Sequence, residues 1–163
     1  MKPKFRQALL CLPLSMILLF TFIACKKNIN PQDPPVTITP LVRPKGTSTG
    51  TAISKEIGIA GGTIQWPGGQ VRVQIPEGAL SNHTAIGIER LSNTNIAGIG
   101  YSYRLTPHGQ IFNKPVTVTF SWADIADSVG LLQTLGLSYQ MDDGIWKFVG
   151  ADAVDTEAKT VSF

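Results

Sequence analysis

The chain contains two histidines, and both lie among turn-forming residues. His83 lies in "SNHT", and His108 lies between Pro107 and Gly109 in "TPHG". A histidine works as a general base where a nucleophile and an orienting carboxylate converge on it. The sequence names no such constellation, and turns select Pro and Gly for backbone geometry. We therefore predict that His108 lies in a backbone turn and that the protein is not an enzyme. A hydrolase function would rest on these two loop histidines alone.

The acidic pair Asp142-Asp143 is the remaining candidate for chemistry. Calcium requires six to eight oxygen ligands, and the flanking residues in "MDDGIW" supply no recognisable loop of them. Asp143-Gly144 is instead typical of a tight hairpin turn. The sequence thus predicts no metal site and no cofactor.

The first 25 residues have the layout of a secretory signal peptide. A basic lead, "MKPKFRQ", precedes the 17 uncharged residues "ALLCLPLSMILLFTFIA", which end at Ala24 immediately before Cys25. "FIAC" resembles the lipobox of bacterial lipoproteins, although Phe22 stands where that motif usually has leucine. The resemblance implies a signal peptide over residues 1–24, cleavage before Cys25, and a diacylglyceryl group on the Cys25 sulfur.

An uncleaved transmembrane anchor is the alternative, since 17 apolar residues are just long enough to span a bilayer. Pro13 within the run and Lys26-Lys27 after it disfavour this alternative, because positive flanks prefer the cytoplasmic side. Both interpretations place the remainder outside the cytoplasmic membrane. The lipoprotein interpretation predicts a bacterial cell-envelope protein, lipid-anchored to the outer membrane or to the extracytoplasmic face of a membrane. Cys11 would leave with the signal peptide and Cys25 would be a thioether, which excludes disulfides and thiol catalysis.

The chain beyond the signal peptide is neutral and begins with a proline-rich stretch. The signal peptide holds three of the 14 basic residues, so 11 remain against 11 acidic ones, and a neutral chain has no electrostatic footprint for nucleic acid. "KKNINPQDPPVTITPLVRPKGTSTG" carries five prolines and no strand or helix period. Residues 25–50 are therefore predicted to be the lipidated cysteine and a disordered proline-rich linker, with a reach of about 75 Å.

From residue 51 onward the hydrophobic pattern has a period of two. Alternating segments bounded by Gly, Pro or Asn predict strands over 62–66, 70–75, 84–90, 101–105, 115–121, 135–141, 145–150 and 159–163. In "WADIADSVG", apolar residues fall at i, i+3, i+4 and i+7, which predicts one short helix ended by Gly130. The fold class is therefore all-β, an antiparallel β-sandwich-like domain over 51–163 with one short helix.

The alternation also predicts which side chains are buried. Val116, Val118 and Phe120 are expected to face the core, and Thr117 and Thr119 to face water. The final segment, 159–163, is predicted either to be an open edge strand, which could accept a strand from a partner, or to precede a natural continuation of the chain.

Two stretches, "AGGTIQWPGGQVRVQIPEGAL" and "YRLTPHGQIFNKPVTVTF", resemble the ZU-five domain of zonula occludens-type scaffolds, netrin receptors, ankyrins and many bacterial surface proteins. The resemblance covers roughly residues 60–163, and it implies a sandwich-like fold used for protein–protein interaction and scaffolding rather than catalysis. The matching positions lie at turns and strand ends: Gly61, Gly62, Pro76, Gly78, Leu80, Pro107, His108, Gly109, Phe112 and Pro115.

These features support two functions from different classes. The first is a lipid-tethered scaffold module, whose partners are the membrane through its lipid and another envelope or surface protein. The second is a glycan-binding module that uses Trp66, Trp122, Tyr101 and Tyr103 as an exposed aromatic platform. The second function requires that Trp66 and Trp122 be exposed, whereas aromatic side chains at strand positions usually belong to the core.

Overall fold

The structure is a computed structural model that describes residues 39–163. The predicted signal peptide, Cys25 and the first part of the linker lie outside the described residues. Thr39–Phe163 forms one compact unit. Within that unit, no helix has the length and apolar character needed to cross a membrane.

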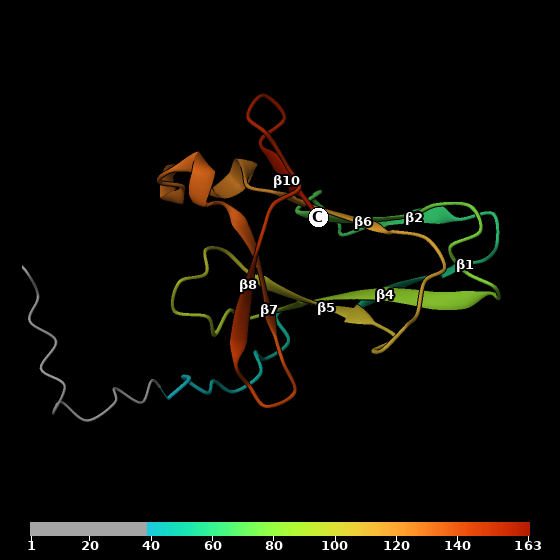
Figure 1. The fold of residues 1–163 in the computed structure, drawn as a ribbon, viewed down its shortest axis with the longest axis horizontal. Coiled ribbons are helices and arrows are strands. Elements are labelled where there is room, and N and C mark those ends of the chain that lie inside the picture. Colours follow the sequence, from blue (N-terminus) through green and yellow to red (C-terminus); the bar gives the residue numbers. More distant parts are fainter. Residues whose placement is uncertain (1–38) are drawn as a thin grey trace, which may run out of the picture. The chain divides into compact units, whose positions relative to one another are not determined.

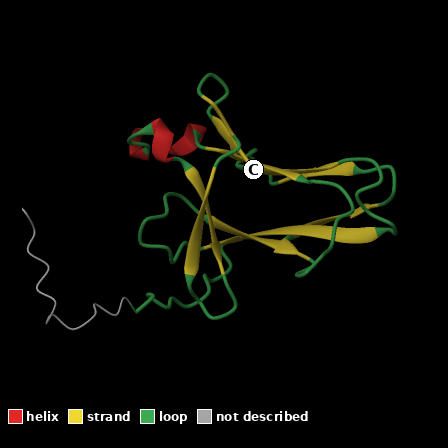
Figure 2. Cartoon of the chain, in the orientation of Figure 1, coloured by secondary structure: helices red, strands yellow, loops and turns green. Residues whose placement is uncertain are grey.

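Strands dominate the described chain, and all of their pairings are antiparallel. Figure 2 shows the strands, with the helical turns gathered at one place. In chain order the elements are β1 (Ile53–Ile57), β2 (Gly62–Gln65), β3 (Val71–Ile75), β4 (Thr84–Leu91), β5 (Ser102–Thr106), β6 (Thr117–Ser121), the 3-10 helices η1 (Ala123–Ser128) and η2 (Leu132–Thr134), β7 (Gly136–Gln140), β8 (Trp146–Gly150), β9 (Ala153–Asp155) and β10 (Thr160–Ser162).

The strands form three sheets. One has the order β1-β4-β5, the second has the order β2-β3-β6-β10-β9, and the third is the hairpin β7-β8. The first two sheets lie as facing layers, and the hairpin crosses them near β10 (Figure 1). The predicted all-β antiparallel sandwich is therefore confirmed.

Glycines close the two predicted hairpins. Gly68 and Gly69 have φ of +94° and +83°, which a glycine adopts without steric cost, and the Trp66 amide donates to the Val71 carbonyl across the turn at 2.9 Å. Gly144, with φ of +82°, adopts the corresponding positive-φ conformation in the turn between β7 and β8. Both turn predictions are confirmed.

The core lies between β1 and β4 on one side and β2 and β3 on the other. On β3, Val71, Val73 and Ile75 are 0%, 3% and 2% exposed, while Arg72 and Gln74 between them are exposed. Side chains from both layers complete the core: Ile57, Ile64, Trp66, Ala79, Leu80, Ile86 and Ile88.

Two predictions about the second sheet are wrong. Thr119 was expected to face water, but it is only 9% exposed, because its cross-strand neighbours Arg72 and Ser162 flank it and its hydroxyl pairs with the Ser162 hydroxyl at 3.2 Å. The last strand is not an edge, because β10 lies between β6 and the short strand β9. The sequence pattern missed β9, which has three exposed residues, and β1, whose burial does not alternate.

The predicted helix is present as a 3-10 helix. η1 starts after Trp122 and is interrupted at Ile125, whose φ of −125° is not helical. Val129 is already extended, so the helix ends before Gly130. The i, i+3, i+4, i+7 pattern located the helical segment but did not distinguish the two helix types.

The folded unit begins earlier than residue 51. Residues 42–49, which we name the strap, bind the domain through main-chain hydrogen bonds. Arg43 N–H donates to the Gly144 carbonyl at 3.0 Å, and Thr49 N–H donates to the Arg90 carbonyl at 2.9 Å. Main-chain hydrogen bonds do not require a periodic pattern of hydrophobic side chains. The sequence composition therefore assigned these residues to the linker.

Candidate functional site

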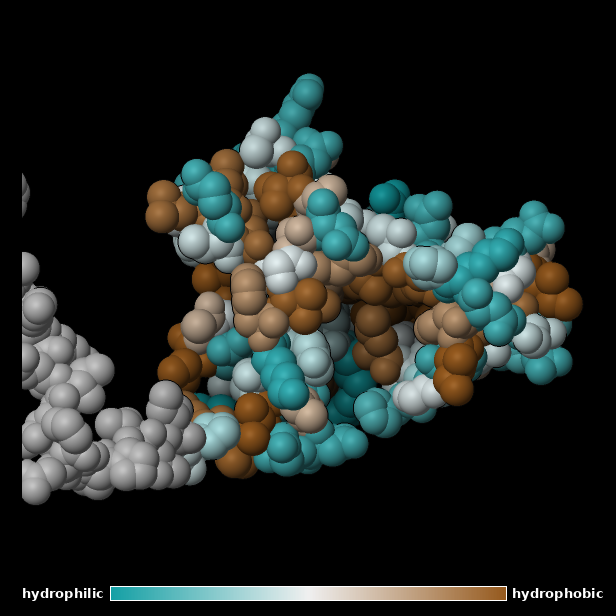
Figure 3. All heavy atoms as spheres, viewed as in Figure 1, coloured by the Kyte–Doolittle hydropathy of each residue, from teal (hydrophilic) through white to brown (hydrophobic). Residues whose placement is uncertain are grey.

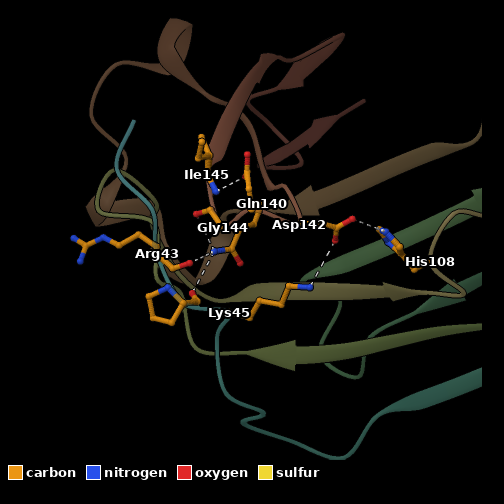
Figure 4. A network of polar contacts seen from close by, with 9 residues as sticks. Arg43, Lys45, His108, Gln140, Asp142, Gly144 and Ile145 are labelled. Carbon is orange, nitrogen blue, oxygen red and sulfur yellow. Dashed lines mark hydrogen bonds and ion pairs between the residues drawn. The ribbon is translucent and has the colours of Figure 1, made fainter. Parts of the chain in front are cut away.

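His108 lies in a solvent-exposed turn. Its side chain is 88% exposed, and its Nε2 is 3.8 Å from Asp142 Oδ2 (Figure 4). The other carboxylate oxygen of Asp142 is 3.8 Å from Lys45 Nζ. Gly109 follows with φ of +75°, as a turn requires. The arrangement is an exposed charge cluster at a loop, with the imidazole held by nothing that would orient it for proton transfer.

His83 is also exposed, and its ring packs over Gly58, where an added Cβ would lie 2.9 Å from His83 Cε1. Within residues 39–163, no group of three or more His, Cys, Asp or Glu side chains is arranged to hold a metal ion. The described part of the chain therefore offers no assembled site for proton transfer or metal chemistry at either histidine.

The glycines of the two motif stretches, 60–80 and 103–120, have structural roles. Gly61 has φ of +71°, and an added Cβ would strike the Ile75 carbonyl oxygen. Gly78 has φ of +76°, and its amide donates to the Ile59 carbonyl at 2.7 Å. A Cβ added at Gly62 would lie 3.4 Å from Ile57 Cγ2. Close backbone approach therefore explains the glycine at 61 and the positive φ explains the one at 78, whereas the space at Gly62 would admit a Cβ.

The two motif stretches bind each other. Lys114 Nζ donates to the Glu77 carbonyl at 2.7 Å, and Asn113 N–H donates to the Ala79 carbonyl at 2.9 Å. Leu80 is buried beneath them, and Phe112 packs against the same core. Pro76 and Pro115 stand just outside β3 and β6, within this junction. The motif residues 76–80 and 112–115 therefore form a structural corner, whereas His108 and Gly109 lie in an exposed turn.

The aromatic residues proposed for a glycan platform are divided by the fold. Trp66 and Trp122 are 7% and 8% exposed, so neither ring is available to a sugar, whereas Tyr101 is 54% exposed. Tyr103 is half-buried, and its ring centroid lies 6.0 Å from that of Trp66 and 6.1 Å from that of Phe120. The aromatics form a row that leads out of the core, not an exposed plane.

A large cavity opens where this aromatic row ends. Its volume is about 1110 Å³, and its wall combines β5, β6, β10, the two 3-10 helices and the β7-β8 hairpin. Figure 3 shows apolar side chains in the hollow between the layers. The principal apolar residues that line the cavity are Tyr101, Leu105, Phe120, Leu137, Phe148 and Phe163.

The strands contribute to this wall in two ways. Every residue from Tyr101 to Thr106 and from Thr134 to Gln140 lines the cavity. From β8 only the alternate residues Trp146 and Phe148 do so, and at β10 only Val161 and the residue after the strand, Phe163. Because successive side chains of a strand point to opposite faces, alternate lining indicates a sheet face and consecutive lining indicates a strand edge. β5 and β7 therefore present edges to the cavity.

Three charged groups of the cavity wall are already engaged, whereas Lys45, His108 and Asp142, which also line the cavity, form the exposed cluster described above. Arg104 Nη1 lies 2.7 Å from Glu89 Oε2, and Asp124 Oδ2 accepts a hydrogen bond from Gln70 Nε2 at 2.8 Å. Arg90 donates to the Thr49 carbonyl and stacks over rings, 4.4 Å from the Tyr101 centroid and 5.8 Å from that of Trp66.

Tyr103, in the same wall, shows the effect of this apolar setting. Burial raises the pKa of the Tyr103 phenol above its ordinary value of 10.0, and the positive charge of Arg90 opposes that rise. The phenol therefore stays protonated at neutral pH and contributes to the wall as a neutral group.

The strap holds the hairpin wall in place. Gln140 Nε2 lies within hydrogen-bonding distance of the carbonyls of Arg43 at 2.8 Å, Pro44 at 3.2 Å and Gly144 at 3.3 Å (Figure 4). One side-chain amide thus joins the strap to the turn of the β7-β8 hairpin.

No family model and no curated protein matches this sequence. The candidate site rests on geometry: an apolar cavity with a few fixed polar groups is the usual form of a binding site. Of the aromatic residues singled out from the sequence, Tyr101, Tyr103 and Trp122 line its wall. The sequence did not predict the cavity itself, because local alternation does not determine the order of strands in a sheet.

Proposed function

We propose that this protein is a membrane-tethered extracytoplasmic lipoprotein whose β-sandwich binds another protein at the cavity between β5 and β7. The observation that carries the proposal is the cavity itself, which exposes apolar side chains beside two strand edges. Large exposed apolar regions on folded domains mark interaction sites. The role is binding rather than catalysis, since the charged groups of the wall are paired or stacked on rings.

The sequence supports the tether. The lipobox-like "FIAC" supplies Cys25 for acylation, and the strap begins only at residue 42. If extended, residues 26–41 would span at most about 50 Å at about 3.1 Å per residue. The resemblance to the ZU-five domain supports the scaffolding role. On this proposal the partner is another envelope or surface protein within that distance of the membrane.

The tether is tested by metabolic labelling with an alkyne fatty acid in a bacterial host. Wild type and Cys11→Ser should both be labelled and should both sediment with membranes. Cys25→Ser should lose the label, because its hydroxyl cannot form the thioether. Labelling of Cys25→Ser at the wild-type level would rule out the tether as proposed.

The binding site is tested by photo-crosslinking on intact envelopes. A photoreactive amino acid replaces either Leu105, in the cavity wall, or Arg72, on the exposed outer face of β3. A discrete protein adduct should form from position 105 and not from position 72. Equal adducts from both positions, or none from either, would reject the site. Adducts composed of glycan alone would favour the glycan-binding alternative.

A further inference from the structure

We infer that the partner enters the cavity as an extended peptide segment, which pairs with the free edge of β5 as an added β-strand. The inference rests on the proposed function and specifies the partner's chemistry. The segment is uncharged and carries apolar side chains at alternate positions. Strand addition of this kind draws affinity from main-chain hydrogen bonds and specificity from pockets for alternate side chains.

The hydrogen bonds of the strap show which groups of β5 are free. Arg90 accepts from Thr49 through its carbonyl, so the main-chain groups of Arg90 point toward the strap and away from β5. Tyr103 is the β5 residue opposite Arg90, and Leu105 follows two positions later. Main-chain direction alternates along an antiparallel ladder. The N–H and C=O groups of Tyr103 and Leu105 therefore point away from β4, toward the cavity.

The same reasoning applies to β7. Met141 N–H donates to the Ile145 carbonyl at 2.9 Å, which makes these two residues a hydrogen-bonded pair. Counting back along the ladder, Tyr139 and Leu137 bond to β8, and the main-chain groups of Ser138 and Gly136 point away from it. Both residues line the cavity. Main-chain donors and acceptors thus border the cavity from two sides.

The sheets leave room for one more strand. Tyr103 on β5 contacts Phe120 on β6, so the last described strand of the three-stranded sheet lies over the middle of the five-stranded one. Beyond β6, Phe163, which follows β10, lines the cavity, and its ring centroid lies 6.3 Å from that of the half-buried Phe120. A strand added beside β5 would cover these side chains with its inward residues and leave its alternate residues toward solvent.

Charge and hydrogen bonding favour a neutral peptide over other occupants. Arg104, Asp124 and Arg90 in the cavity wall already have partners, and the other two charged lining residues, Lys45 and Asp142, are solvent-exposed and lie 3.8 Å from each other. A charged side chain buried in the apolar part of the cavity would therefore be desolvated without compensation. An acyl chain would match the apolar wall, but it would remove water from the edges of β5 and β7 and replace none of their hydrogen bonds. An extended peptide satisfies both the apolar wall and the edges.

The probe is a seven-residue acetylated and amidated peptide that alternates valine with threonine and carries a fluorescein. Its binding to the full acylated protein in nanodiscs is followed by fluorescence anisotropy. Leu105→Pro deletes the N–H that faces the cavity and spares the bonds to β4, whereas Leu105→Ala keeps that N–H. Leu105→Pro should bind the peptide about fivefold more weakly than Leu105→Ala, the effect of one net hydrogen bond.

Two methylated peptides provide the test on wild-type protein. N-methylation of the odd-numbered amides removes donors along one edge of the peptide, and N-methylation of the even-numbered amides removes those along the other. If β5 pairs with one edge of the peptide, the dissociation constants of the two methylated peptides should differ by at least about tenfold. This comparison decides the question even if Leu105→Pro fails to fold, which circular dichroism checks.

Several results would overturn the inference. These are equal binding by both methylated peptides, equal binding by the two Leu105 variants, or a fluorescent fatty acid that binds and is not displaced by the peptide. If the protein self-associates and the associated form no longer binds the peptide, the site is occupied by a second copy of this chain instead. If position 105 still crosslinks to a partner in envelopes, strand addition fails while the proposed function stands.

Discussion

The two ends of the sandwich use similar apolar residues with opposite results. At the closed end, where β1 and β4 face β2 and β3, Val71 and Ile88 are buried almost completely. At the open end, formed by β5, β10 and the β7-β8 hairpin, Phe148 is 63% exposed and Leu105 is 37% exposed. Side chains at the closed end meet an opposing layer, and those at the open end border a cavity.

This difference separates stability from recognition. Burial of apolar surface contributes about 25 cal/mol per Å², so the closed end has gained its hydrophobic stabilisation within the domain. The open end retains apolar surface whose burial can drive association with a partner. Substitutions at the two ends should therefore change different measured quantities.

The largest expected effect is at the closed end. Ile75→Ala should lower the free energy of unfolding by about 2–5 kcal/mol, because a fully buried side chain leaves a cavity. Phe148→Ala at the open end should lower it by less than about 1 kcal/mol, because most of that ring is already in contact with water. Urea denaturation measures both. Comparable losses in the two variants would show that the open end is packed as tightly as the closed end.

A pair of glycines sharpens the comparison within turns. Gly61 and Gly109 have nearly the same φ, +71° and +75°, but a Cβ at Gly61 would strike the Ile75 carbonyl while one at Gly109 would meet nothing within 4 Å. Gly109→Ala should cost about 1 kcal/mol for the positive φ alone. Gly61→Ala should cost about 2–3 kcal/mol, because the backbone must also shift.

Thermal denaturation of both variants checks this pair. The difference between them isolates the close approach at the closed end from the intrinsic cost of the conformation. A Gly109→Ala loss as large as that of Gly61→Ala would mean that the "TPHG" turn is packed rather than open.

Local alternation predicted most of the strands but not their neighbours. Val71, Val73 and Ile75 alternate strictly, and the structure buries all three, because a period of two follows directly from strand geometry. β10 was expected to be an edge and is flanked on both sides, since pairing with β6 and β9 depends on contacts distant in sequence. Local pattern therefore predicts faces, and long-range pairing decides edges.

The same limit applies to the candidate site. Tyr101, Tyr103 and Trp122 were singled out as aromatic residues and all three line the cavity, yet Trp122 is buried, as is Trp66. Composition cannot tell these cases apart, because exposure depends on which strand lies opposite. The strap was assigned to the linker for a similar reason, since its main-chain hydrogen bonds require no particular side chains.

The strap provides a smaller test of how the open end is held. Gln140→Ala removes the amide that joins the strap to the hairpin turn, and it should lower the free energy of unfolding by about 1 kcal/mol. Gln74→Ala, on the exposed face of β3, should change it by less than about 0.5 kcal/mol. Hydrogen exchange at the Arg43 amide, which bonds to Gly144, should accelerate in Gln140→Ala only. Unchanged exchange there would mean that the strap is held without Gln140.

The smallest expected effect concerns Tyr103, at the boundary between the two ends. Burial raises the pKa of its phenol above 10.0, so the folded state holds that proton more tightly than the unfolded state does. The associated stability is fully present below pH 10 and is lost as the pH rises through the folded-state pKa. Tyr103→Phe keeps the ring beside Trp66 and Phe120, so the two proteins should be similarly stable near pH 7. Above pH 10, wild type should lose stability more steeply than Tyr103→Phe in urea titrations. If the stabilities of wild type and Tyr103→Phe change in parallel with pH, the Tyr103 phenol is as solvent-exposed as the other side chains of the open end.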